Sequence, residues 1–321
     1  LVGCVMTLTT ISFPCFLVAR LVQAMGACSV IISAFAMIRD CHNKDDLAQP
    51  MGVVMAIIGV APTIAPLLGS ILLVYVGWKS TFVFQLILGL FFTGMIAIFC
   101  RETQDKKYKQ SLQVSSIYSN YVALLCNPMF LLPCLLSGIV YGILFSYISL
   151  APAYVMGSFH GSAMAVGWVI LLMGLILFTM SLVVPQVLVN KGESFVMIMG
   201  CGCLILGALS MVVLLQLWGG SPTSFIVPMS LIMVGIGAIR ACISMIAMKR
   251  IDRCLAGSAA SVFNGITFLG GCVFSSLSVF IVHYPVCFGL CSLVLGLVAW
   301  LLANVISGQA VARGDTDIAV A

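Results

Sequence analysis

The stretch MFLLPCLLSGIVYGILFSYISLAPAY, from Met129 to Tyr154, contains no Asp, Glu, Lys or Arg. It lies inside a longer uncharged run, residues 111–190, and two further uncharged runs cover residues 194–239 and 254–312. A helix needs about 20 consecutive apolar residues to cross the hydrocarbon core of a bilayer. The sequence therefore predicts several membrane-spanning helices.

The composition of the whole chain points the same way. Charged residues make up 7% of the 321 residues and hydrophobic residues 62%, whereas a soluble domain carries roughly 25% charged residues. A bilayer can surround that much apolar surface because lipid takes the place of water around the helices. We therefore predict an all-α polytopic membrane protein and exclude a soluble globular fold.

The cysteines and histidines form no pattern typical of a ligand set. Most of the 14 cysteines lie inside apolar runs, and the chain has no CxxC pair. A buried cysteine behaves as a small hydrophobic residue. We expect no metal site and no cofactor, and no nucleic-acid partner.

Polar and Gly/Pro-rich breaks divide the chain into ten apolar segments. The first is too short to cross a bilayer unless further residues precede it. The ten segments are residues 1–12, 13–38, 50–75, 81–100, 129–154, 165–189, 195–217, 223–248, 256–282 and 286–306.

The main interruption is the polar segment RETQDKKYKQ, which runs from Arg101 to Gln110. It follows four of the apolar segments and precedes the other six. We predict four regions: the rest of an N-terminal helical half (1–100), a cytoplasmic connector (101–128), a C-terminal six-helix half (129–306) and a cytoplasmic tail (307–321).

Lysine and arginine are concentrated in alternate loops, and such a bias marks the cytoplasmic side of a membrane protein. If the loop after residues 13–38 is cytoplasmic, eleven cations face inward and only Lys79 faces outward. The eleven are Arg39, Lys44, Arg101, Lys106, Lys107, Lys109, Lys191, Lys249, Arg250, Arg253 and Arg313. The alternation supports the number of segments, since adding or removing one would scramble it.

Arg20 lies within an apolar segment, where a charge is costly unless it is paired or reaches water. Gln23, Ala24 and Ala27 follow it at helical spacing and share its face. A small, polar face suits close helix packing or a wet cavity. The alternative is an arginine that extends to the membrane surface.

The segment GVAPTIAPLLGS, residues 59–70, combines two prolines with small residues at intervals of four. The prolines are Pro62 and Pro66, and the small residues are Ala61, Ala65 and Gly69. Proline bends a helix, and small residues let a neighbouring helix approach closely. From the residues alone, passive packing explains this segment as well as a functional role does.

These two segments resemble known transporter motifs. LVARLVQAMGA (17–27) is similar to the fourth-helix motif of major facilitator drug/proton antiporters, and residues 61–70 resemble the fifth-helix antiporter motif, GxxxGPxxGG. Ala61, Ala65 and Ser70 replace glycines of that motif. More of the chain resembles the Bcr/CflA group of bacterial drug exporters, through MIRD (37–40), APTIAPLLGSIL (61–72), GWKSTF (77–82), RET (101–103) and FSYISLAP (145–152).

The resemblance implies a major facilitator fold with about ten of its twelve helices, helices 3–12. The first two helices and the gating loop after the second would then be absent. The proton-binding acid of the family is often on the first helix, and all nine acids of this chain lie in loops or at helix ends. Arg39 and Asp40 are expected to pair at a cytoplasmic helix end.

Residues 129–154 are the best candidate for a substrate-cavity wall. Tyr141 and Phe145 share one helical stripe, and Tyr147 adds a polar edge. Aromatic surfaces can repack around varied ligands, but the same residues could simply face lipid. Arg240, within residues 223–248, is expected either to contact substrate or to extend toward the cytoplasm.

The resemblance implies secondary active efflux of drugs or other small lipophilic compounds across the bacterial inner membrane. Proton antiport would drive it by alternating access, in a monomer with a cytoplasmic C-terminus. The partners would be a small-molecule substrate, protons and the lipid bilayer. Two alternatives are an importer of a small nutrient and an inactive truncated remnant. An enzyme is not expected, because no group of catalytic residues lies at membrane depth.

Overall fold

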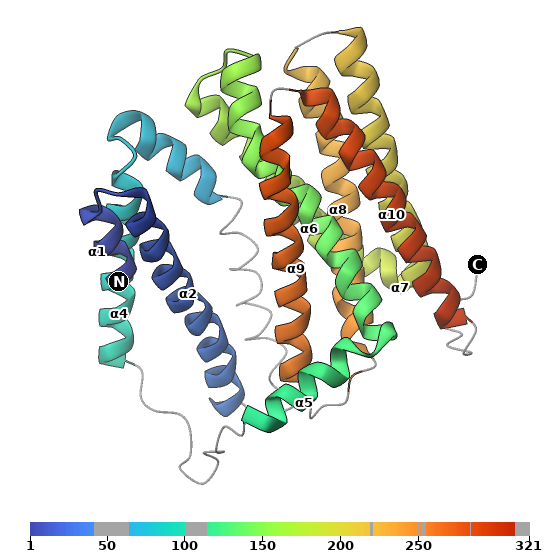
Figure 1. Cartoon of the computed structure of the whole chain (residues 1–321), viewed down its shortest axis with the longest axis horizontal. Coiled ribbons are helices and arrows are strands. Elements are labelled where there is room, and N and C mark those ends of the chain that lie inside the picture. The colour runs from blue at the N-terminus through green and yellow to red at the C-terminus, as the bar shows by residue number, and fades with distance from the viewer. Residues whose placement is uncertain are drawn as a thin grey trace. The chain divides into compact units, whose positions relative to one another are not determined.

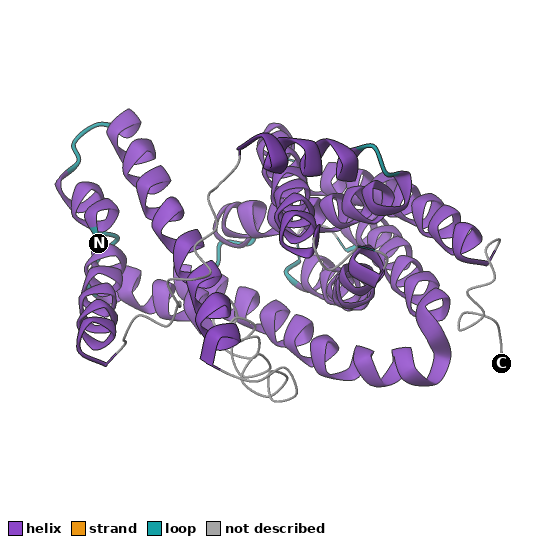
Figure 2. Ribbon diagram, turned by 90° about the horizontal axis from the view of Figure 1, so that it is seen from below, coloured by secondary structure: helices purple, strands orange, loops and turns teal. Residues whose placement is uncertain are grey.

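A computed structural model describes residues 1–41, 64–99, 114–218, 221–249, 251, 255–282 and 284–311. Every regular element in these residues is a helix, and they contain no strand (Figure 2). The all-α prediction is therefore confirmed. The chain forms two compact units, Leu1–Leu112 (unit 1) and Gln113–Ala321 (unit 2), each of which has its own packing.

Unit 1 contains four described helices (Figure 1). They are α1 (Val2–Thr9), α2 (Phe13–Cys41), the helix Ile64–Tyr75 and α4 (Ser80–Phe99). The short helix α1 packs against both α2 and α4. A Cβ atom added to Gly3 would lie 2.8 Å from the carbonyl oxygen of Ala19, so glycine allows the backbones of α1 and α2 to meet.

A tight turn joins the helix Ile64–Tyr75 to α4. Gly77 has a φ of 105° in this turn, a conformation that costs glycine little. The hydroxyl of Ser80 donates a hydrogen bond to the carbonyl of Leu72 at 3.1 Å. The segment GWKS therefore reverses the chain and fixes where α4 begins.

Unit 2 contains five longer helices and three shorter elements (Figure 1). Asn127 caps the helix that begins at Pro128, because its side chain accepts a hydrogen bond from the backbone N–H of Met129 at 3.0 Å. The elements are α5 (Val114–Leu125), α6 (Pro128–Ala153), a π-helical turn (Tyr154–Ser158), α7 (Ala163–Leu217), α8 (Thr223–Lys249), α9 (Ala256–Ser278), a 3-10 turn (Val279–Ile281) and α10 (Pro285–Val311).

Helix α7 has 55 residues, which would extend about 80 Å at 1.5 Å per residue. That is more than twice the roughly 30 Å of a hydrocarbon core. Gly192 interrupts the helix with φ 81° and ψ 169°, so α7 supplies two spans, as the predicted segments 165–189 and 195–217 require. Glu193 then pairs with Lys249 at 3.3 Å, which places this bend and the end of α8 at the same end of unit 2.

Two helix pairs in unit 2 meet through glycines. A Cβ atom on Gly235 of α8 would lie 2.5 Å from the carbonyl oxygen of Gly200 on α7. A Cβ atom on Gly270 of α9 would lie 2.5 Å from the carbonyl oxygen of Gly138 on α6. Close backbone approach through small residues is typical of membrane helix pairs. All six described helices of unit 2 contribute to one buried apolar core, in which the ring of Phe225 contacts those of Tyr147, Tyr154 and Phe288.

Seven of the described helices are long and apolar enough to cross a membrane, α7 counting once despite its bend. Helices α1 and Ile64–Tyr75 are shorter. Part of the predicted segment 50–75 lies outside the described residues, so the full count of ten remains a prediction. The predicted connector 101–128 contains α5, which packs on α6 and α9.

Candidate functional site

Arg20 of unit 1 is part of a polar network that joins three helices. Its Nη1 donates a hydrogen bond to Oε1 of Gln23 at 2.7 Å. The Nε2 of Gln23 donates to Oε1 of Gln85 on α4 at 2.6 Å and contacts the sulfur of Cys4 on α1 at 3.1 Å. The guanidinium carbon of Arg20 also lies 5.8 Å from the ring centre of Phe82.

Within the described residues, this network orients Arg20 without neutralising it. Residues three apart on a helix share a face, so Gln23 can accept from Arg20 while its amide nitrogen holds α1 and α4. A guanidinium has five N–H donors, and only one of them is used in the described bonds. The others remain available for a carbonyl, nitro or anionic group.

The helical spacing of Arg20 and Gln23 predicts their shared face, whereas Cys4, Phe82 and Gln85 come from other helices and carry no such local pattern. Gln85 is the one glutamine of the apolar segment 81–100, and that isolation was the available signal. Ala24 and Ala27, predicted to share the packing face, are exposed. The α1 contact instead uses Ala19, which is fully buried.

The proposed antiporter motif is only partly within the described residues. Ala61 and Pro62 lie outside them. Ala65, Pro66 and Gly69 lie on the helix Ile64–Tyr75, where Ala65 is exposed and the other two are partly buried.

The predicted cytoplasmic helix end also lies only partly within the described residues. Arg39 and Asp40 belong to the last turn of α2. Their side chains are outside the description, so their pairing remains a prediction.

Three aromatic residues of unit 2 form a cluster, here called the aromatic triad: Tyr141 and Phe145 on α6 and Phe268 on α9. Ring centres lie 6.0 Å apart for Tyr141 and Phe145, 6.0 Å for Tyr141 and Phe268, and 6.1 Å for Phe145 and Phe268. These separations are in the range of favourable aromatic pairs. Phe145 also lies against Gly271, where no side chain intervenes.

Arg240 of α8 completes this cluster. Its guanidinium carbon lies 5.8 Å from the ring centre of Tyr141, a cation–π distance. Within the described part of the chain, no carboxylate or hydrogen-bond acceptor pairs with Arg240. The structure thus brings together the predicted residues Tyr141, Phe145 and Arg240, and adds Phe268 from α9, which no sequence pattern predicts.

Tyr147 lies on the other side of α6. Two residues after Phe145, it is rotated by about 200° around the helix, and its side chain is 0% exposed. Its ring stacks on Phe225 at 5.7 Å, and its hydroxyl has no hydrogen-bond partner in the described residues. Tyr147 therefore belongs to the core of unit 2, and its predicted place in a cavity wall remains untested.

The acidic side chains that the structure describes are limited to Glu193, at the bend of α7. It pairs with Lys249. A titratable acid at membrane depth is thus not found in the described part of the chain. Both candidate clusters carry positive charge, and each offers N–H donors beside aromatic rings.

Residues 1–275 match the family model described as Major Facilitator Superfamily. The chain is 28% identical over 306 residues to a chloramphenicol resistance protein of Pseudomonas aeruginosa, an alignment that covers 90% of this chain and 69% of that relative.

Two further relatives align over shorter regions. The multidrug resistance protein MdtL of Shewanella sp. (strain ANA-3) is 27% identical over 142 residues, which cover 44% of this chain and 35% of the relative. A bicyclomycin resistance protein homolog of Haemophilus influenzae is 28% identical over 110 residues, 34% of this chain and 27% of the relative.

Proposed function

Because the chain belongs to the Major Facilitator Superfamily, a family of membrane transporters, we propose that it exports drugs or other small lipophilic compounds by proton antiport. The observation that carries this proposal is the aromatic triad beside Arg240. Flat apolar rings bind lipophilic molecules with little demand on their shape, and a free guanidinium can hold their polar groups. The relatives are named for resistance to chloramphenicol, bicyclomycin and multiple drugs.

The proposal includes a monomer that works by alternating access in the bacterial inner membrane, with its C-terminus in the cytoplasm. The distribution of lysine and arginine between alternate loops supports this orientation. The network around Arg20 would shape the charge that substrate and protons meet. The antiporter-like segment 61–70 would limit leakage.

Efflux measurements test the proposal directly. The chain is expressed, within the longest reading frame that contains it, in a bacterial host lacking its own drug exporters. Cells are loaded with radiolabelled chloramphenicol, and its loss is followed with and without a protonophore. We expect efflux that the protonophore abolishes. Uptake of a nutrient without drug efflux would favour an importer, and no transport at all would favour an inactive chain.

The role of the triad is tested with Phe268→Ala. Phe268→Ala removes one of the three rings that a ligand could contact, and one aromatic contact contributes about 0.5–1.5 kcal/mol, so the apparent affinity for chloramphenicol should fall several-fold. Phe280→Ala is the matched control, because Phe280 is 82% exposed and makes no described ring contact. Equal effects of the two substitutions would contradict the proposed role of Phe268.

A further inference from the structure

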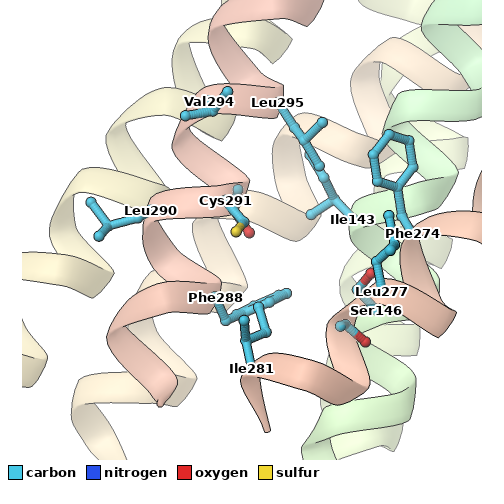
Figure 3. A pocket seen from close by; sticks show the side chains of 12 residues that line it. Ile143, Ser146, Phe274, Leu277, Ile281, Phe288, Leu290, Cys291, Val294 and Leu295 are labelled. Atoms are coloured by element: carbon cyan, nitrogen blue, oxygen red, sulfur yellow. The ribbon is translucent and has the colours of Figure 1, made fainter.

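A separate cavity of about 370 Å³ lies within unit 2, between α6, α9 and α10. Figure 3 shows Phe288 and Cys291 of α10 across from Phe274 and Ser146. None of the residues that line it is charged, and none belongs to the aromatic triad. Its volume lies at the lower end of the 300–1,000 Å³ typical of small-molecule sites.

Two serines in this cavity have no hydrogen-bond partner among the described residues. Ser146 and Ser292 are only 4% and 3% exposed, and neither hydroxyl forms a hydrogen bond within the described part of the chain. Helical serines normally donate to a carbonyl three or four residues earlier. Ser278, which also lines the cavity, does so with Ser275 at 2.6 Å.

Neither hydroxyl is among the fully enclosed unpaired atoms of the described residues, so both reach the open space of the cavity. Polar groups in apolar surroundings are nearly always paired, so two such hydroxyls on one cavity favour an occupant that carries a polar group. A saturated hydrocarbon chain would leave both hydroxyls unpaired. A cation would be buried without a carboxylate to balance its charge, which is unfavourable. The surrounding apolar side chains require that the rest of the occupant be apolar.

We infer that this cavity binds a neutral lipophilic molecule of one to four rings that carries a carbonyl, nitro or ether oxygen. Ser146 and Ser292 donate hydrogen bonds to that oxygen, and Ile143, Phe274 and Phe288 enclose the apolar part. This inference depends on the proposed function in one respect, namely that the ligand would be a compound that the protein exports. Binding itself can be measured without transport.

The native thiol of Cys291 provides a test in the unmodified protein. Cys291 lines the cavity and is exposed, whereas Cys272, on α9 and also exposed, does not line it. Purified chain in lipid nanodiscs is treated with N-ethylmaleimide, and labelling of each cysteine is followed by mass spectrometry. Nile red, a neutral dye with a ring carbonyl, should slow labelling of Cys291 at least threefold and leave Cys272 unchanged.

Two competing probes define the chemistry. The cation ethidium and the hydrocarbon dodecane should give no protection at concentrations where Nile red does. Equal protection by dodecane would assign the cavity to lipid chains and overturn the role of the serines. Equal protection by ethidium would overturn the preference for neutral molecules.

Substitutions of the two serines test the role of their hydroxyls. Ser146→Ala with Ser292→Ala should raise the Nile red concentration that halves labelling, by about twofold to tenfold for each hydrogen bond lost. Ser261→Ala, at an exposed serine of α9 that bonds to the carbonyl of Gly257, should change nothing. An unchanged value in the double variant would overturn the inference.

A second pair of variants tests the site even if the serine variants fail to fold. Leu290→Trp should fill the cavity and abolish protection of Cys291. Leu297→Trp should not, since Leu297 has a similar exposure on the same helix but does not line the cavity. Protection that survives Leu290→Trp overturns the site.

Efflux separates this inference from the proposed function. If chloramphenicol is exported but Nile red does not protect Cys291, the cavity proposal fails alone. If protection is seen but no compound is exported, the proposed function fails and the binding site stands.

Discussion

Arg20 and Arg240 hold their guanidinium groups in different ways. Arg20 donates a charge-assisted hydrogen bond to Gln23 and lies over Phe82, so its position is fixed from two sides. Arg240 contacts the ring of Tyr141 and keeps its donors free within the described residues. We infer that Arg20 sets a fixed local charge, whereas Arg240 can follow a ligand.

Replacing Arg20 tests the first role. Arg20→Ala should lower the rate of drug efflux at least tenfold. Arg20→Lys should retain part of the rate, because an ammonium keeps the charge but loses the planar contact with Phe82. Lys79→Ala is the control, since Lys79 is a cation of the same unit whose described contact is with the ring of Trp78. Unchanged efflux in Arg20→Ala would exclude a role for this residue in transport.

Tyr147 offers a second test at the scale of one atom. Its buried hydroxyl is unpaired in the described residues, and an unpaired buried polar group costs about 1–3 kcal/mol. Tyr147→Phe should therefore raise the thermal unfolding temperature in detergent. Tyr154→Phe should lower it slightly, because the hydroxyl of Tyr154 donates to the carbonyl of Ile281 at 3.4 Å. A loss of stability in Tyr147→Phe would mean that its hydroxyl has a partner in solution.

Among the helices, glycine contacts decide how closely two axes approach. The α6–α9 pair meets at Gly138 and Gly270, and the α7–α8 pair meets at Gly200 and Gly235. Lipid offers no hydrophobic force between apolar helices, so close packing supplies much of the association. The four helices are thereby held as two tight pairs within unit 2.

A methyl group at Gly270 should separate α6 from α9. Gly270→Ala places a Cβ atom 2.5 Å from the carbonyl oxygen of Gly138, and such overpacking typically costs about 1–3 kcal/mol. Gly265→Ala, on the same helix with no atom within 4 Å of the added Cβ, should leave the unfolding temperature unchanged or slightly raise it. Equal unfolding temperatures for the two variants would contradict the tight contact.

The helical period explains which parts of the candidate site could be predicted. Tyr141 and Phe145 are four residues apart, so a shared face follows from sequence alone. Tyr147 was grouped with them by residue type, although the period turns it toward Phe225 and the core. Phe268 and Gln85 approach from other helices, and contacts between distant segments leave no mark in local periodicity.

At the scale of the whole molecule, the fold class and family followed from composition and a few motifs. Uncharged runs separated by polar breaks gave helix positions such as 81–100 and 286–306, close to the observed Ser80–Phe99 and Pro285–Val311. The short motifs identified the Major Facilitator Superfamily, which the family match confirms. The packing of α7 on α8 and of α6 on α9 could not be predicted, because apolar helices of similar composition have many possible neighbours.

Orientation in the membrane can be checked in intact cells. Lys79 and Lys191 are predicted to lie on opposite sides. A membrane-impermeant maleimide should label Lys79→Cys in intact spheroplasts, above the level of the unmodified chain. It should label Lys191→Cys only after the cells are permeabilised. The reverse pattern would invert the proposed topology.

The bend at Gly192 also has a consequence for synthesis. A single non-helical residue separates the two halves of α7. The first half is therefore not followed by a loop that would give it time to enter the bilayer before the second half is synthesised. We expect the two halves to leave the translocon together, as one hairpin. A ten-residue glycine–serine linker inserted at Gly192 should uncouple them, so that a nascent chain stalled just after the linker already holds residues 163–191 in the bilayer. Without the linker, the same segment should still be extractable by alkali at that length.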